Sequence, residues 1–340
     1  MISVLLYIIN LLLLPFRVIY VHDKKHTKKG ETKMQSTDFL KARFGIEIEM
    51  TGVTRNKAAK VVAEVLRGSI KRENDYYDTY KVTASDGRVW KLMYDGSIYA
   101  QKKVNGAKVA AAKEYSVELV SPILTYKEDI ETLQEVVRKL RKAGAFSEKQ
   151  NCTGIHIHLD GADHTPRSIR NFINIIYSRN DLLYESLQIE RERMRYCKKM
   201  DKDLVERINK KKPTTMKQIE DIWYEGYGSN RERHYHESRY HFLNLHSFFN
   251  GTGTVELRGF NGTMHAGVIR SNIVLALALN YQAITQKSAS SKKPQVENPK
   301  FAMRTWLNRI GFIGEDFKNC REHLIKHLQG SAAWRFQRAA

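Results

Sequence analysis

The 340-residue chain has few cysteines and no glycine-rich phosphate loop. Cys152, Cys197 and Cys320 are an odd number of cysteines at long spacings, which excludes a disulfide framework or a zinc knuckle and favours a reducing compartment. The chain contains no glycine pattern of the Walker or dinucleotide-binding type, so those two modes of phosphate binding are excluded. A mean hydropathy of −0.51 excludes a protein made of several membrane spans.

Acidic residues are outnumbered in this chain. It has 57 Lys and Arg against 37 Asp and Glu, which gives a net charge of +20 and a pI of about 9.7. This excess is compatible with nucleic-acid binding, although net charge governs association and solubility rather than chemistry. Residues 1–33 contain six basic and two acidic residues, so the rest of the chain still has a net charge of +16. The hydrophobic fraction of 42% and the charged fraction of 28% are those of a folded globular protein.

Residues 2–21 are almost wholly apolar, apart from Asn10 and Arg17, and a basic run follows at 24–33. A membrane helix requires ~20 mainly apolar residues, a length that this segment just reaches. No basic residue precedes it and no small-residue cleavage site follows it, so a secretory signal peptide is a poor match. The basic flank predicts a cytoplasmic protein tethered to the inner face of the membrane. The alternative is an incorrect start, with Met34 opening the protein.

Strands and helices follow one another without a regular βαβ order in the rest of the chain. This mixture predicts an α+β fold with a mainly antiparallel sheet and flanking helices. The segment 287–300 contains serine, lysine and two prolines, which predicts a linker between a main domain at 40–286 and a helical tail at 301–340. We predict strands at 44–50, 88–94, 114–120, 154–159, 240–245 and 254–260, and helices at 56–67, 127–143, 166–187, 200–212, 216–224 and 265–286.

Charged residues and histidines alternate with apolar residues on four of these strands. Because successive side chains of a strand point to opposite faces, residues two apart share a face. The sets that share a face are Glu47 and Glu49, His156 and His158, Glu256 and Arg258, and Glu114, Ser116 and Glu118. In each strand, the opposite face carries apolar or aromatic side chains.

Each set taken singly is typical of a solvated strand face or of a surface ion pair. Taken together, the polar positions hold glutamate, histidine and arginine, the residue types that bind metal ions and phosphate. If the four strands belong to one sheet whose apolar face packs on helices, the polar faces converge on one surface. Crowded carboxylates repel one another, and a divalent cation keeps them ionised. The pattern therefore predicts a metal-binding surface on the sheet.

Seven short stretches, taken in order, resemble the amidoligase family, a group of carboxylate–amine ligases built like glutamine synthetase and glutamate–cysteine ligase. Each stretch alone has little specificity, and the ordered set extends over about 43–286. The stretches are 44–49 (FGIEIE), 94–98 (YDGSI), 117–122 (VELVSP), 154–158 (GIHIH), 195–197 (RYC), 243–245 (LNL) and 253–258 (GTVELR). The segment 198–239 has no counterpart in this resemblance, and we predict that it is a basic helical insertion.

The resemblance implies a curved antiparallel sheet of the glutamine synthetase type with ATP and Mg²⁺ on its concave face. It also implies ATP-dependent joining of a carboxylate to an amine as an amide or peptide-like bond. By this likeness the metal ligands are Glu47, Glu49, Glu118, Glu256 and His156. The ATP- or phosphate-binding residues are His156, Arg195, Asn244 and Arg258, and the catalytic residues are Arg258, His158 and Asp95. Arg191 and Arg193 lie so close to Arg195 that the sequence alone does not choose among the three.

The expected reaction passes through an acyl phosphate. A carboxylate does not react with an amine in water, because the leaving group would be oxide. Transfer of a phosphoryl group from ATP supplies a better leaving group, and that transfer depends mainly on positioning and on neutralising phosphate charge. The substrates are then a carboxylate and an amine, including a peptide or an anionic polymer.

Two other interpretations stay open. The His156 and His158 pair, flanked by isoleucines, also has the form of a metal-dependent nuclease or relaxase that attacks single-stranded DNA with a tyrosine such as Tyr177 or Tyr184. That interpretation leaves the glutamates unexplained, since an acidic face repels a phosphate backbone unless metal fills it. The other interpretation is a binding module on the same scaffold that has no turnover.

The basic charge of the insertion also has two interpretations. Charge density is highest at 191–239, and Lys210, Lys211 and Lys212 are consecutive there. Such a run is either a solvated helix face or a surface that recruits an acidic peptide, a polymer or an anionic lipid headgroup.

Overall fold

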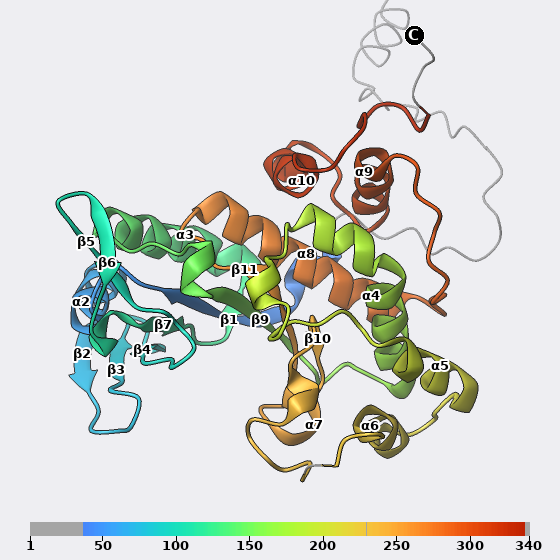
Figure 1. The fold of residues 1–340 in the computed structure, drawn as a ribbon, viewed down its shortest axis with the longest axis horizontal. Coiled ribbons are helices and arrows are strands. Elements are labelled where there is room, and N and C mark those ends of the chain that lie inside the picture. Colours follow the sequence, from blue (N-terminus) through green and yellow to red (C-terminus); the bar gives the residue numbers. More distant parts are fainter. Residues whose placement is uncertain (1–36, 229, 337–340) are drawn as a thin grey trace, which may run out of the picture. The chain divides into compact units, whose positions relative to one another are not determined.

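The computed structural model describes residues 37–228 and 230–336, which belong to one compact unit (Figure 1). This part of the chain contains a nine-stranded sheet in the order β10-β11-β9-β1-β7-β4-β3-β2, with β8 beside β1, and the paired strands are antiparallel. The strands are β1 (Arg43–Met50), β2 (Ser69–Arg72), β3 (Tyr80–Thr83), β4 (Val89–Met93), β7 (Val117–Val120), β8 (Leu124–Thr125), β9 (Gly154–Asp160), β10 (Leu243–Asn244) and β11 (Thr254–Asn261). A separate hairpin pairs β5 (Gln101–Val104) with β6 (Ala107–Ala110).

Helices cover one side of the large sheet. Figure 1 shows α3, α4 and α8 above β1 and β9, with α9 and α10 beyond them. The helices are α2 (Arg55–Leu66), α3 (Tyr126–Lys142), α4 (Pro166–Ser186), α5 (Lys202–Lys211), α6 (Met216–Tyr224), α7 (His246–Asn250), α8 (Ala266–Thr285), α9 (Pro299–Arg309) and α10 (Lys318–Ile325). The predicted α+β fold with a mainly antiparallel sheet and flanking helices is therefore confirmed.

Local sequence accounts for the position of these elements. Residues 271–280 of α8 are buried on all sides, as expected for a helix that is apolar all round. Helix α4 begins at Pro166, directly after Thr165, whose side chain and that of Ser168 form a capping box. On the sheet, the side chains of Ile46, Ile48, Ile155 and Ile157 are all at most 1% exposed. The apolar face of the sheet packs into the core, so its polar face lies on the other side.

Two of the predicted strands are shorter in the structure. The strand expected at 114–120 begins only at Val117, because Lys113–Tyr115 form a 3-10 turn and the hydroxyl of Ser116 donates a hydrogen bond to the carbonyl of Asp95. Glu114 is therefore exposed and does not share a strand face with Glu118, contrary to the expectation. The strand expected at 240–245 is reduced to β10. Its preceding residues pair instead with Lys198, whose carbonyl accepts a hydrogen bond from the Phe242 amide at 2.9 Å.

The apolar segment 2–21 lies outside the described residues. Within residues 37–228 and 230–336, no helix is both long and apolar enough to cross a membrane. The segment predicted as an insertion contains α5 and α6, and the segment predicted as a tail contains α9 and α10. The proposed domain boundaries stay predictions.

Candidate functional site

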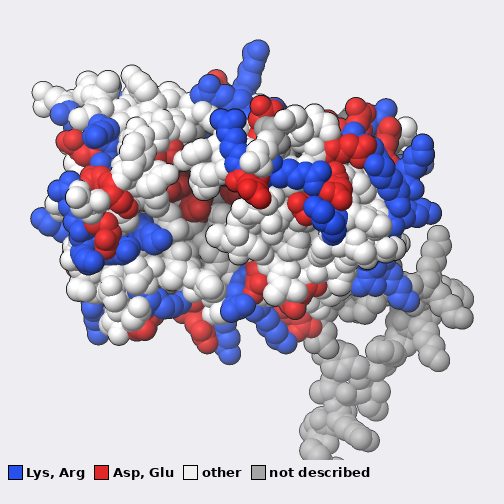
Figure 2. All heavy atoms as spheres, turned by 90° about the horizontal axis from the view of Figure 1, so that it is seen from below, with Lys and Arg blue, Asp and Glu red and all other residues white. Residues whose placement is uncertain are grey.

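The sheet order makes neighbours of the four strands that carry the polar pattern, since β7, β1, β9 and β11 are consecutive. The residues that lie opposite one another are Glu49 and Glu118, Glu47 and His156, and Glu256 and His158. Directly opposed residues of antiparallel strands have side chains on the same face. We call these six residues together with Arg258 the acidic face. Figure 2 views the molecule from below, the side away from α3 and α8, and shows acidic side chains within a hollow left of the middle of that surface.

Glu47 lies at the centre of the acidic face. One of its carboxylate oxygens is 2.8 Å from Nδ1 of His156, and the other is 3.1 Å from Nε2 of His158. His156 is also 3.7 Å from a carboxylate oxygen of Glu49 and 3.7 Å from one of Glu256. These contacts link three neighbouring strands through polar side chains that are mostly buried.

Among the described residues, three groups of side chains place their ligand atoms within 4.8 Å of one another. They are Glu47 with Glu118 and His156, Glu47 with His158 and Glu256, and Glu49 with Asp95 and Glu118. Glu47 and Glu118 each belong to two groups, so the three groups form one continuous surface. The sequence-predicted metal ligands are all among these residues, and the structure brings them together.

Asp95 reaches the acidic face from the loop after β4. Its Oδ1 accepts a hydrogen bond from the Ser97 amide at 2.6 Å, and the backbone at Asp95 is joined to the buried Ser116 hydroxyl. Tyr235, in the segment 230–236, lies near the same place. The hydroxyl of Tyr235 lies 3.4 Å from that of Tyr77, and this hydrogen bond, with burial and the charge of Asp95, raises the pKa of Tyr235 to about 12. Neither tyrosine lies in one of the sequence motifs that predict the site.

Strand β11 is irregular between Leu257 and Phe260, next to the buried Arg258. The Nη1 group of Arg258 donates a hydrogen bond to Glu256, while its Nε is buried without a hydrogen-bond partner among the described residues. Asn244 donates a hydrogen bond to the other oxygen of Glu256 at 2.6 Å. Asn244 and Arg258, both predicted to bind ATP or phosphate, therefore hold Glu256 between them.

Arg193 is the buried arginine of the 191–195 segment. Arg195, which was predicted to bind ATP or phosphate, is exposed and has its guanidinium 4.7 Å from the centre of the Tyr196 ring. The side chain of Arg193 is almost fully buried and donates hydrogen bonds to the carbonyls of Arg258 and Phe260. A glycine opposite makes room for it, because a Cβ atom at Gly154 would lie 2.2 Å from Nη2 of Arg193. That glycine beside the two histidines is the one sequence signal for Arg193.

Negative and positive side chains balance each other at the β11 end of the acidic face. Burial opposes ionisation of Glu256, but the charges of Arg258, His158 and His156 outweigh it and lower the pKa of Glu256 to about 2. Burial likewise opposes ionisation of Glu47, and the two histidines hold its pKa well below its usual range. Burial also opposes the charge of His158, yet Glu47 and Glu256 raise its pKa to about 9.

The other end of the acidic face has an excess of carboxylates. Burial, followed by the charges of Glu47, Glu49 and Asp95, raises the pKa of Glu118 well above its usual range. Burial also raises the pKa of Glu49, whose Oε2 accepts a hydrogen bond from the Gly154 amide at 2.6 Å. Buried carboxylates crowded against one another favour a cation as a ligand. Their oxygens, with imidazole nitrogen beside them, form a donor set that fits Mg²⁺ or Mn²⁺.

The two tyrosines considered for nuclease chemistry lie away from the histidines. Both are on α4, on the side of the sheet that the helices cover (Figure 1). Tyr184 is buried and donates a hydrogen bond to the carbonyl of Cys197. The Tyr177 ring lies 5.3 Å from Nζ of Lys293. Neither residue faces His156 or His158.

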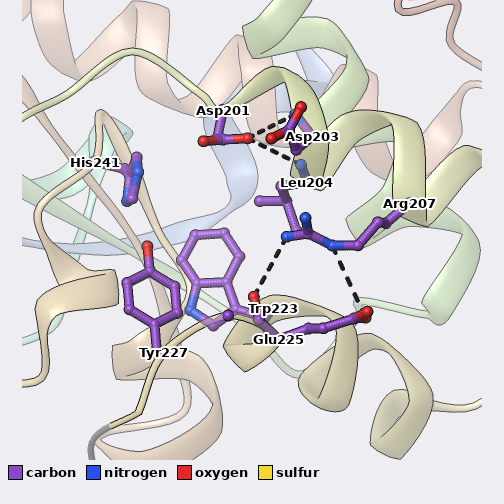
Figure 3. Close-up of a pocket in the computed structure, with 9 residues that line it drawn as sticks. Asp201, Asp203, Leu204, Arg207, Trp223, Glu225, Tyr227 and His241 are labelled. Atoms are coloured by element: carbon purple, nitrogen blue, oxygen red, sulfur yellow. Dashed lines mark hydrogen bonds and ion pairs between the residues drawn. The ribbon is translucent and has the colours of Figure 1, made fainter.

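A cavity of about 200 Å³ lies in the 198–241 segment (Figure 3). Figure 3 shows the rings of Trp223, Tyr227 and His241 on one side and Arg207 on the other. The guanidinium of Arg207 donates a hydrogen bond to the Glu225 carbonyl and forms an ion pair with the Glu225 carboxylate. The carboxylate of Asp201 caps α5 by accepting hydrogen bonds from the Asp203 and Leu204 amides. The charged groups of this cavity are thus largely engaged within the fold, in contrast to the carboxylates of the acidic face.

The fold and the acidic face define an α+β protein with a carboxylate- and histidine-lined sheet surface. Residues 40–280 match the model of a family described as "putative amidoligase enzyme", and the chain belongs to that family. The resemblance of the ordered motifs to this family is thereby confirmed.

A comparison with solved structures found similarity to a bifunctional glutathione synthetase from Pasteurella multocida, with 13% sequence identity and a TM-score of 0.38. The match covers 85% of this chain and 47% of that chain, so this protein spans about half the length of that enzyme. No curated protein matches the sequence.

Proposed function

We propose that this protein is an ATP-dependent carboxylate–amine ligase that forms an amide or peptide-like bond through an acyl phosphate. Membership of the amidoligase family supports a ligase reaction in general. The observation that carries the specific proposal is the overlap of three carboxylate-containing ligand groups on one sheet surface beside a buried arginine. A glutamine synthetase-like arrangement of the sheet is part of the same proposal.

Most residues of the acidic face are candidate metal ligands. Glu47, Glu49, Glu118, Glu256 and His156 would hold divalent cations. A divalent cation held by these residues would supply the positive charge that phosphoryl transfer needs near the phosphate oxygens. No protein nucleophile is needed for that transfer, which agrees with the presence of carboxylates and histidines rather than an activated serine or cysteine on this face.

Arg258 is the candidate for stabilising the transferred phosphoryl group. One edge of its guanidinium is held by Glu256, and its buried Nε retains an unused donor. A guanidinium is well suited to phosphate oxygens because it presents several N–H groups in one plane. His158, held by Thr254 at 3.0 Å, and the half-buried Asp95 lie at the edges of the acidic face, where they can contact the carboxylate or the amine.

The proposed substrates include a peptide or an anionic polymer. This part of the proposal is supported by the exposed lysines 210–212 at the end of α5 and by the basic balance of the chain. The Tyr77 and Tyr235 pair, close to Asp95, places the end of the same segment next to the acidic face.

The experiment incubates the protein with ATP, Mg²⁺ and pairs of candidate substrates, and measures the release of ADP. The candidates are amino acids, dicarboxylates and short peptides, used as carboxylate and amine donors. We expect release that requires both a carboxylate and an amine. Glu47→Gln should abolish it while the fold is retained, and the exposed Glu114→Gln is the matched control. Normal turnover of Glu47→Gln at saturating Mg²⁺ would contradict the proposal. ATP binding without ADP release across the panel would favour the binding module, and a covalent adduct with single-stranded DNA would favour the nuclease.

A further inference from the structure

A second cavity, of about 390 Å³, lies on the helix-covered side of the sheet. Its walls come from the first turns of α8, from α10 and the residues after it, and from the loop at 187–190. Phe260 of β11 forms part of the wall, so the strand separates this cavity from the acidic face. Helix α10 lies beyond residues 40–280, so the family match does not account for this cavity.

Most polar groups of the wall are used within the fold. Asn261 donates a hydrogen bond to the Gln188 carbonyl at 2.8 Å and accepts one from the Glu190 amide at 3.2 Å. The Ser186 hydroxyl donates to the carbonyl of Leu324, and the Thr263 hydroxyl accepts from the amide of His265. These bonds build the wall and leave those groups little capacity for a ligand.

Asn272 is the exception. Its residue is only 4% exposed, its side chain lines the cavity, and the amide makes no hydrogen bond with the described residues. Val268, one helical turn earlier on α8, lines the same cavity, so the Asn272 amide lies on the helix face that borders it. An amide that is open to a cavity and makes no hydrogen bond within the fold keeps its donors and its acceptor available to a ligand.

The surroundings of Asn272 are rich in hydrogen-bond donors. Lys326 brings a positive charge, and His323 and His327 add two imidazoles from the same end of α10. Burial first, then neighbouring positive groups, lowers the pKa of both histidines, so each is an uncharged donor at neutral pH. Val268 lies in the first turn of α8, where the helix dipole is positive. Glu190 is the one acidic residue among the described residues of the wall.

We propose that this cavity binds a small anion, a phosphate or a carboxylate, through Asn272 and Lys326. The volume is more than ten times that of a water molecule in the liquid, ~30 Å³, so the anion can carry an organic part. The bound anion would touch the back of β11, because Phe260 lines the cavity while its carbonyl accepts a hydrogen bond from Arg193. The C-terminal helices thus acquire a role in completing a binding site.

The test is isothermal titration of the full chain with inorganic phosphate and, separately, with succinate, at constant ionic strength. The variants are Asn272→Leu and Lys326→Met, and the matched control is Lys318→Met, which removes an exposed lysine at the other end of α10. We expect the wild type and the control to bind one of the two anions and both variants to bind it at least about tenfold more weakly. The anion that binds decides between a phosphate and a carboxylate ligand.

Absence of binding by both anions, or binding that both variants retain, would overturn the proposal. Binding at the acidic face alone would give the second result, since neither residue belongs to it. If Asn272→Leu does not fold, the exposed Lys326→Met decides the outcome. The ADP-release experiment is independent, so a failure of the ligase proposal would leave this result unchanged.

Discussion

Arg193 donates a hydrogen bond to the backbone carbonyl of Arg258 over 3.0 Å. It donates a second hydrogen bond to the carbonyl of Phe260. Both carbonyls belong to the irregular part of β11, where the backbone hydrogen bonds to β9 are interrupted. A buried side chain from another segment therefore fixes the backbone that presents Arg258 to the acidic face. The geometry of the site depends on a residue that does not itself lie on that face.

Replacement of Arg193 should be strongly destabilising. Arg193→Met leaves two buried carbonyls without a donor, so we expect a loss of about 2–4 kcal/mol in the free energy of unfolding. Arg195→Met is the matched control, because Arg195 is exposed, and its cost should stay within about 0.5 kcal/mol. Urea unfolding of the two variants measures the difference. Equal costs would show that Arg193 has no special role in β11.

Gly154 should act through the same contact. A Cβ atom there would lie 2.2 Å from Nη2 of Arg193, so Gly154→Ala must displace the guanidinium from the carbonyls that it serves. Its cost should overlap with that of Arg193→Met, and the double variant should lose clearly less stability than the two single losses together. Gly45→Ala is the control, since its Cβ would meet nothing closer than 3.8 Å. Additive losses in the cycle would contradict a shared mechanism.

The acidic face was predictable from the sequence because its signal is local. Alternation along β1, β9 and β11 decides which side chains share a face, and the buried isoleucines behind them decide which face is outside. Three features depend on tertiary contacts and were not predictable. The turn at Glu114 depends on the hydrogen bond from Ser116 to the Asp95 carbonyl. The burial of Arg193 rather than Arg195 depends on the irregular part of β11, whose carbonyls Arg193 binds. The pairing of 240–242 depends on Lys198, which belongs to the insertion.

Stability without divalent cations should have a maximum at mildly acidic pH. The pKa of Glu118 is raised well above its ordinary value of 4.5, and that of His158 is raised from 6.5 to about 9. The protonated forms of both groups therefore stabilise the folded state. This contribution is lost as the pH rises through the pKa values of the folded protein. Glu47 and Glu256 have lowered pKa values, so their contribution is lost as the pH falls below about 4.5. Thermal unfolding in EDTA between pH 4 and pH 9 measures this profile.

The stabilisation by Mg²⁺ should grow over the same range. Deprotonation of Glu118 removes a competing proton from a proposed ligand, so the rise in melting temperature on adding Mg²⁺ should be larger at pH 8 than at pH 6. The comparison needs the EDTA sample at each pH as its reference. A Mg²⁺ effect that is independent of pH would argue against Glu118 as a ligand.

The lysines of the insertion should matter only for an anionic partner. Conversion of Lys210 and Lys212 to Gln removes two exposed charges and spares Lys211, which is 2.6 Å from Glu225. Binding to vesicles rich in phosphatidylserine, or to polyglutamate, should weaken by about 1 kcal/mol per lysine at low salt and by less at high salt. Replacement of Lys202, an exposed lysine at the start of α5, is the control. Unchanged binding at low salt would leave the run as a solvated helix face.

Glu118→Gln should separate stability from activity. The substitution removes one charge from the end of the acidic face where carboxylates are in excess, so the variant should be more stable than the wild type at pH 8 in EDTA. It also removes a ligand atom from two of the three groups, and we expect ADP release to fall on the order of 100-fold. Glu114→Gln, four residues away and exposed, should change neither property. A variant that loses both stability and activity would indicate that Glu118 supports the fold directly, whereas one that keeps its activity would remove Glu118 from the proposed metal site.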